Sequence, residues 1–312
     1  IAHIPCASLT IKHNAIYTCL SVMLRMAANK IRSAGCLIIG DEVLNGKIRD
    51  TNSYEFAKLC FNTLNIPLKK VLVCSDDVQD IKDLIKVLDS QVDFIITSGG
   101  LGSTHDDVSY QAIAEYYNVP YELDQDVVDR MKRLRQPYLS KLSHDQLKAF
   151  YKMATLPKQT KDVSVEKIFS DDNLWFPIVG IQSKLYILPG IPQLFVKLIN
   201  DMIPLILPRT DSVDVSRTFI KTSTGESEFA PFLTDFQAQL DSKFGVDAVK
   251  LGSYPHIAWK LNTISIIVKT SVINAGELDS IHNNIIDNIG GNAQQIDQTE
   301  EDKLSNEDPS RL

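Results

Sequence analysis

The sequence is poor in cysteine, with five in 312 residues and no Cys-x-x-Cys pair. All five lie in the first quarter of the chain, at Cys6, Cys19, Cys36, Cys60 and Cys74. Disulfide-stabilised domains and structural zinc sites use paired cysteines at short spacings. The cysteine pattern therefore argues against both, and it favours reduced thiols in an intracellular protein.

A long hydrophobic run is also missing. The stretch Ala15–Ala28 is apolar, but Arg25 interrupts it and it is shorter than the roughly 20 residues that span a bilayer. We therefore expect a soluble, cytoplasmic protein without a membrane partner. Residues 1–33 hold four basic residues and no acidic one. They are typical of either a mitochondrial presequence or an upstream extension that is not native to the protein, and both interpretations stay open.

Excess positive charge is absent too, because 32 Lys and Arg stand against 39 Asp and Glu, for a net charge of −7. An acidic surface repels phosphates unless a basic face is set apart, so no nucleic-acid partner is expected. The charge is uneven: residues 297–312 hold six acidic and two basic residues and no apolar periodicity. This composition predicts an acidic, disordered tail over residues 293–312.

Length and hydrophobic pattern predict two domains after the N-terminal extension 1–33. In residues 34–208, short apolar runs at 36–39, 71–74 and 94–97 alternate with helical patterns at 52–64, 80–88 and 108–117. This alternation predicts an α/β domain with a doubly wound, largely parallel sheet. Residues 209–292 predict a smaller α+β domain of order βαββα. Residues 157–173 are expected to form a loop ahead of two strands, Trp175–Val179 and Lys184–Leu188.

Three predicted strand ends carry unusual loops. These are Gly40–Gly46 with the following Asp50-Thr51-Asn52, Ser98–Asp107, and Leu188–Pro192. Ligands of open parallel sheets bind beyond the carboxyl ends of the strands, so the three loops are expected to share one site. The second loop has glycines at 99, 100 and 102, which fit neither a P-loop nor a GxGxxG pattern.

The glycine loop is expected to bind phosphate through its backbone amides and through the N-terminus of a helix that starts near Asp107. Asp106 and Asp107 follow it directly. Either aspartate can cap that helix. Two carboxylates beside a phosphate are unfavourable unless a divalent cation lies between them, and Mg²⁺ is commonly bound by one or two carboxylates plus substrate phosphates.

Taken together, the segments GDEVLNGKIRDTNS (Gly40–Ser53), TSGGLGSTHDD (Thr97–Asp107) and LPGIP (Leu188–Pro192) resemble the molybdopterin-binding-domain family in its CinA-type branch. Within that branch the chain is most similar to the N-terminal region of eukaryotic two-domain FAD synthases. The turn Thr224–Ser227 and the strand Gly252–Pro255 add to the resemblance, which covers about residues 34–290. Ser103 departs from it, because the family often has proline there. Since the sequence carries neither an amidase nor an FAD-synthesising domain, neither of those activities is expected.

The resemblance implies metal-dependent hydrolysis of a dinucleotide pyrophosphate, either FAD to FMN and AMP or ADP-ribose, with Mg²⁺, Mn²⁺ or Co²⁺ as cofactor. Transfer of adenylate to molybdopterin and a non-catalytic nucleotide sensor remain alternatives. A homo-oligomer is also expected from the family.

The residues implied by the resemblance fall into two groups. The catalytic group is Asp41, Glu42, Asp106 and Asp107, of which Asp41, Asp106 and Asp107 would bind the metal. The ligand contacts are Gly40, Asn45, Thr51, Asn52, Ser98, Gly99, Gly100, Gly102, Ser103, Thr104, Pro189, Gly190, Pro192, Gly225, Glu226 and Ser227. Asn52, Glu226 and Ser227 can equally be helix-capping residues. Trp175 and Trp259 are expected to be packing residues rather than flavin contacts.

Overall fold

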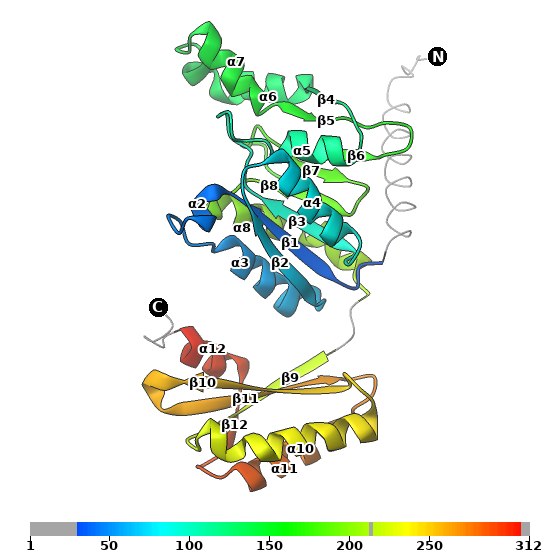
Figure 1. Ribbon diagram of the computed structural model, residues 1–312, viewed down its shortest axis with the longest axis vertical. Coiled ribbons are helices and arrows are strands. Elements are labelled where there is room, and N and C mark those ends of the chain that lie inside the picture. The colour runs from blue at the N-terminus through cyan, green and yellow to red at the C-terminus, as the bar shows by residue number, and fades with distance from the viewer. Residues whose placement is uncertain (1–29, 212–214, 307–312) are drawn as a thin grey trace, which may run out of the picture. The chain divides into compact units, whose positions relative to one another are not determined.

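The computed structural model describes residues 30–211 and 215–306 and divides the chain into two compact units, Ile1–Ser212 and Val213–Leu312 (Figure 1). The division lies four residues after the boundary expected from the sequence. The predicted extension falls largely on residues 1–29, outside the described residues. Its last part, however, belongs to the first unit: Ile31 is fully buried, and its N–H donates to the Arg209 carbonyl at 2.9 Å.

The first unit is built on a six-stranded sheet with the order β2-β1-β3-β8-β7-β6. Its strands are β1 (Ala34–Ile39), β2 (Leu68–Cys74), β3 (Phe94–Ser98), β6 (Val165–Ile168), β7 (Ile178–Ile181) and β8 (Leu185–Leu188). The first four strands in this order are parallel, β7 pairs antiparallel with β8, and β6 pairs antiparallel with β7. The predicted doubly wound, largely parallel sheet is confirmed. The prediction of a loop over 157–173 is wrong for Val165–Ile168, because these residues form β6 at the edge of the sheet.

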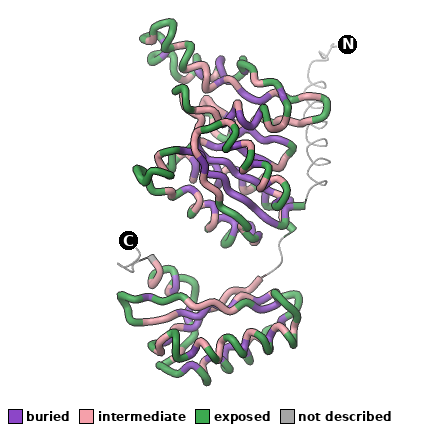
Figure 2. Tube along the Cα trace, in the orientation of Figure 1, coloured by how far each residue is buried: buried purple, intermediate pink, exposed green. Residues whose placement is uncertain are grey.

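Helices cover both faces of this sheet, as Figure 1 shows. In β1, Cys36 and Ile38 face the core that includes α3 (Asn52–Leu59) and α8 (Pro192–Asp201). Leu37 and Ile39 face the core on the side of α4 (Val78–Asp89) and α5 (Ser109–Tyr116). All six β1 residues are buried, as is usual for parallel strands covered on both sides (Figure 2).

Shorter elements complete the first unit. The four-residue helix α2 (Asp41–Leu44) follows β1, a π-helix (Cys60–Leu64) continues α3, and α9 (Ile203–Ile206) follows α8. An arm is formed by β4 (Tyr121–Leu123), α6 (Gln125–Leu139), α7 (His144–Lys152) and β5 (Thr155–Pro157), with β4 paired to β5. Asp124 anchors this arm, because its buried carboxylate accepts hydrogen bonds from Val127 N–H and from Lys167 Nζ at 2.9 Å.

The second unit has the predicted βαββα order in β9 (Val215–Thr222), α10 (Glu226–Phe244), β10 (Val249–His256), β11 (Leu261–Lys269) and α11 (Ala275–Ile289). Its antiparallel sheet has the order β10-β11-β9-β12. The prediction of a disordered tail is wrong over the part that the structure describes. Strand β12 (Gln294–Ile296) pairs with β9, and helix α12 (Gln298–Asn306) follows it.

Specific contacts hold this tail segment. Glu300 pairs with Lys221 of β9, and Glu301 is buried with its Oε2 3.6 Å from Nε2 of the fully buried His256. Asp297 Oδ1 accepts the Glu300 N–H at 2.8 Å and so caps α12. The polar composition of the tail therefore reflects an edge strand and a capped helix.

Three cysteines lie in the described part of the chain, Cys36, Cys60 and Cys74, and all are buried free thiols, as expected. Burial raises the pKa of Cys60 to about 12, which keeps its thiol protonated. Cys6 and Cys19 fall outside the described residues. Among those residues, no helix has both the length and the apolar character needed to cross a membrane.

Candidate functional site

A cavity of about 470 Å³ lies at the carboxyl ends of β1, β3 and β8. The chain runs from β1 outward to β2 and then returns to β3 on the other side of β1, so this is the point where the strand order reverses. All three predicted loops contribute to the lining. Of the predicted residues, those that line the cavity are Glu42, Thr51, Asn52, Ser98, Gly99, Gly100, Gly102, Asp107, Pro189, Gly190 and Pro192.

Two glycines allow the loops to meet. Gly99 has φ +114°, and a Cβ placed on it would lie 2.0 Å from the carbonyl oxygen of Ile39 at the end of β1. A Cβ on Gly190 would lie 3.2 Å from Gly99 Cα. Only glycine fits the first position, since both the conformation and the space exclude a side chain. The backbone of the second loop is thereby pressed between the first and the third.

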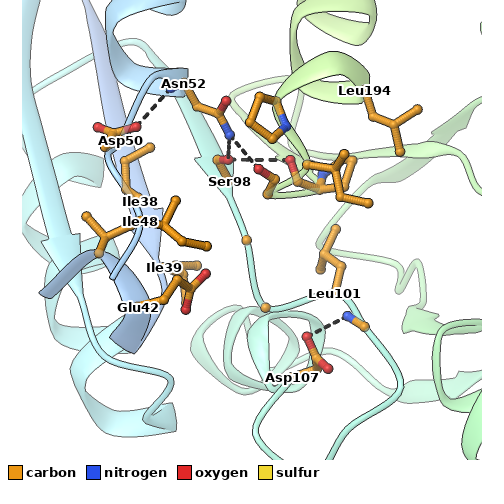
Figure 3. A pocket seen from close by; sticks show the side chains of 18 of the residues that line it. Ile38, Ile39, Glu42, Ile48, Asp50, Asn52, Ser98, Leu101, Asp107 and Leu194 are labelled. Atoms are coloured by element: carbon orange, nitrogen blue, oxygen red, sulfur yellow. Dashed lines mark hydrogen bonds between the residues drawn. The ribbon is translucent and has the colours of Figure 1, made fainter. Parts of the chain in front are cut away.

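Asn52, the first residue of α3, ties the loops together through its side chain (Figure 3). Its Nδ2 donates to Ser98 Oγ and to the Gly190 carbonyl, both at 2.9 Å. Asn52 is only 6% exposed, and its Oδ1 has no partner among the described residues. The capping reading of Asn52 is wrong, because Asp50 Oδ1 accepts the N–H groups of Asn52 and Ser53. The Asn52 amide therefore fixes the site and leaves one acceptor there unused.

Asp107 organises the glycine loop. Its Oδ1 accepts the Gly102 N–H at 2.6 Å (Figure 3). Its Oδ2 accepts the Thr104 N–H at 2.9 Å together with the Thr104 hydroxyl. Lys152, at the end of α7, donates from Nζ to the Thr104 carbonyl and joins the arm to the loop. Helix α5 begins at Ser109 and its N-cap residue is Val108, so neither Asp106 nor Asp107 is its N-cap.

Two of the three glycine N–H groups in this loop already donate hydrogen bonds within the protein. Gly99 N–H donates to the Leu188 carbonyl at 3.2 Å, and Gly102 N–H is occupied by Asp107. Gly100 N–H donates to none of the described residues. Of the three amides predicted to bind phosphate, Gly100 therefore remains as the donor that a ligand can use without breaking an existing bond.

Sequence reasoning missed Asp76 beside this loop. Its Oδ2 accepts the Asp41 N–H at 2.9 Å, and a Cβ built on Gly100 would lie 3.4 Å from its Oδ1. Burial raises the pKa of Asp76, and the negative charges of Glu42, Asp41 and Asp106 raise it further, although the Asp41 N–H opposes them. Asp76 follows the predicted strand 71–74, so the rule that found the other loops could have found it.

Whether a divalent cation fits this region depends on the carboxylates of Asp41, Glu42, Asp76 and Asp106. Their hard oxygen donors suit Mg²⁺ or Mn²⁺. Yet within residues 30–211 and 215–306 no three Asp, Glu, His or Cys side chains are arranged around one metal position. Asp107 uses both its oxygens within the loop. The donor set therefore suits a cation that completes its shell with ligand phosphates and water, and the metal stays a prediction.

The other predicted residues lie elsewhere. Gly40, Asp41, Asn45, Ser103, Thr104 and Asp106 sit in the same loops but do not line the cavity. Asn45 Oδ1 accepts the Lys47 N–H, a local turn contact. Gly225, Glu226 and Ser227 belong to the second unit at the start of α10, where Gly225 N–H donates to Glu228 Oε1 at 3.2 Å.

Sequence reasoning also missed much of the lining. Arg49 is its basic residue, and most of the remainder is apolar. The missed residues are Ile38, Ile39, Val43, Ile48, Arg49, Asp50, Leu101, Tyr110, Met153, Trp175, Phe176, Ile191 and Leu194. Trp175 was expected only to pack, but it packs and lines the cavity.

The chain is similar to several known proteins. A probable FAD synthase of Caenorhabditis elegans is 27% identical over 77% of this chain and 47% of its own length. A CinA-like protein of Flavobacterium psychrophilum is 28% identical over 66% of this chain and 48% of its length. The chain thus spans about half the length of these relatives. A CinA structure from Thermoplasma acidophilum has a TM-score of 0.48 and 24% identity, covering 56% of this chain and 98% of that one.

The match to a known protein family lies within the first unit. Residues 35–208 match the family described as probable molybdopterin binding domain, which is more than half of the chain. The matched range begins within β1 and ends shortly after α9, so it includes all three loops of the cavity. The chain therefore belongs to the molybdopterin-binding-domain family.

Proposed function

We propose that this protein is an enzyme that acts on nucleotides and hydrolyses the pyrophosphate bond of a dinucleotide, with FAD as the favoured substrate and FMN and AMP as products. One observation carries the proposal: a cavity at the strand-order reversal is lined by the glycine loop and by Glu42, and just outside its lining Asp76 lies beside Gly100 and accepts the Asp41 N–H. Relatives described as probable FAD synthases support a nucleotide as the substrate class.

In this proposal the ligand phosphates lie against Gly100 N–H, with Arg49 as the neighbouring positive charge. One or two of the carboxylates of Asp41, Glu42, Asp76 and Asp106 would hold a divalent cation together with phosphate oxygens and water. When bound, that cation supplies charge neutralisation and a site for water. The raised pKa of Asp76 supports this, because crowded carboxylates favour an added positive charge.

The test is to incubate the protein with FAD and with ADP-ribose, with and without Mg²⁺, Mn²⁺ or Co²⁺, and to follow the release of FMN or AMP. We expect release that requires the metal. Tight ligand binding without release under any metal would favour a nucleotide sensor instead. Formation of adenylyl-molybdopterin from ATP would favour the transferase.

Asp76→Asn is the sharpest variant for this test. The asparagine oxygen can still accept the Asp41 N–H, so the change removes charge and keeps the contact. We expect the metal-dependent rate to fall about tenfold or more, a typical loss when groups around a metal change. Glu122→Gln is the matched control, because this exposed carboxylate of β4 does not line the cavity. Equal rates in the two variants would contradict the role of Asp76.

A further inference from the structure

The cavity lining is mixed. Its polar residues include Glu42, Arg49, Asn52, Ser98 and Asp107, and Ile38 and Ile39 of β1 also line it. A second set of lining residues, here called the apolar wall, comes from the glycine loop, the arm, the segment before β7 and the start of α8. Its residues are Leu101, Met153, Trp175, Phe176, Ile191 and Leu194. Such a division suits a ligand with a charged end and a flat apolar end.

Trp175 is held firmly in this wall. Its ring centroid lies 5.7 Å from that of Phe150 and 5.1 Å from that of Phe176, the latter at an interplanar angle of 79°. Arg130 fixes the backbone just before it, because its Nε and Nη2 donate to the Leu174 carbonyl at 3.2 and 3.1 Å. A partly buried aromatic ring held on two sides is an organised surface for a second ring.

We propose that Trp175, with Phe176 and Met153 beside it, contacts the isoalloxazine ring of a flavin nucleotide and so selects FAD over ADP-ribose. This rests on the proposed function, since the phosphates must lie at the glycine loop. The side chains of Leu101, Ile191 and Leu194 cannot hydrogen-bond to the ring. The apolar wall therefore recognises the flavin by its flat apolar surface and not by the donors and acceptors at its edge. ADP-ribose carries a ribose where FAD carries the flavin, and a ribose has no flat face to stack.

The chain has two tryptophans, Trp175 and Trp259, which makes direct observation simple. In Trp259→Phe, Trp175 is the remaining tryptophan, and metal-free titration with FMN should quench its fluorescence saturably while AMP quenches it little. By calorimetry, Trp175→Ala should raise the Kd of FMN about tenfold, the size of one lost stacking contact. The same variant should change the Kd of ADP-ribose less than threefold.

Trp175→Phe separates recognition from packing, because it keeps an aromatic ring against Phe150 and should restore most FMN affinity. If Trp175→Ala does not fold, the quenching experiment and Phe176→Leu decide in its place. Equal losses of FMN and ADP-ribose affinity, or unchanged FMN affinity, would overturn the proposal. FMN binding that depends on Trp175, without FAD hydrolysis under any metal, would support it and overturn the proposed hydrolase activity alone.

Discussion

Replacing Asp107 with asparagine tests whether this residue organises the loop or binds metal. Asp107 accepts three hydrogen bonds, from Gly102 N–H and from the N–H and hydroxyl of Thr104. Asparagine has one oxygen, so it can keep the Gly102 contact but turns an NH₂ group toward the Thr104 N–H. At least one bond to a charged acceptor is lost, which costs about 1.5–3 kcal/mol in general.

Because Asp107 is only half-buried, the lower end of that range applies, and ~1.4 kcal/mol corresponds to a tenfold change in the ratio of ordered to disordered loop. A ligand that binds only the ordered loop then shows a higher Kd, by up to about tenfold, as the ordered fraction falls. We expect this increase for FMN or AMP by isothermal titration calorimetry without metal. The Mg²⁺ concentration that gives half-maximal hydrolysis should change little.

Asp106→Asn is the matched comparison, since the Asp106 carboxylate is exposed and accepts neither the Gly102 N–H nor the Thr104 N–H, which both donate to Asp107. It should leave metal-free binding unchanged. Our reasoning would be refuted if Asp107→Asn bound FMN and AMP normally without metal and required far more Mg²⁺ for hydrolysis. Asp107 would then be a metal ligand, as the sequence predicted.

Three further changes test the fold around the site and the second unit. Gly99→Ala should cost more than 3 kcal/mol or prevent folding, because the new Cβ would overlap the Ile39 carbonyl; a melting temperature within 2 °C of wild type would contradict this. Asn52→Leu should lower the free energy of unfolding by about 1–3 kcal/mol and weaken FMN binding, since two hydrogen bonds between loops are lost; urea unfolding measures it. Burial lowers the pKa of His282, whose Nε2 lies 2.6 Å from Thr218 Oγ1. The neutral form is thus favoured in the fold, so its stabilisation is complete above the unfolded pKa of about 6.5 and is lost as pH falls below it. His282→Gln should flatten the pH dependence of the melting temperature between pH 7 and 5, and an unchanged slope would exclude the effect.

The sequence allowed the parallel sheet and the meeting of the three loops to be predicted, because both follow from local patterns. Buried runs such as Cys36–Ile39 mark strands, and the residues after them must gather at one edge. The tie through Asn52 could not be predicted in this way. Its partners Ser98 and Gly190 lie 46 and 138 residues away, and nothing local distinguishes the role from a helix cap.

The apolar wall escaped prediction for a different reason. An apolar run such as Trp175–Val179 reads as a strand, but the strand begins at Ile178, and the two aromatic residues before it turn toward the cavity. Asp107 shows the opposite case. The sequence places Asp107 in the loop correctly but does not reveal that its carboxylate accepts the N–H groups of Gly102 and Thr104. A carboxylate after a glycine loop has the same sequence pattern whether it binds a metal or backbone amides.

Strand β12 has a practical consequence for how the second unit can be handled. Its three residues pair with Phe219–Lys221 of β9, which is otherwise at the margin of the sheet. A recombinant fragment cut at residue 292, where composition alone would end the domain, leaves those backbone groups open to another chain. Open edges of this kind recruit strands from neighbouring molecules. Such a fragment is expected to self-associate more readily than one that keeps residues 293–306, and its association would mimic a natural oligomer.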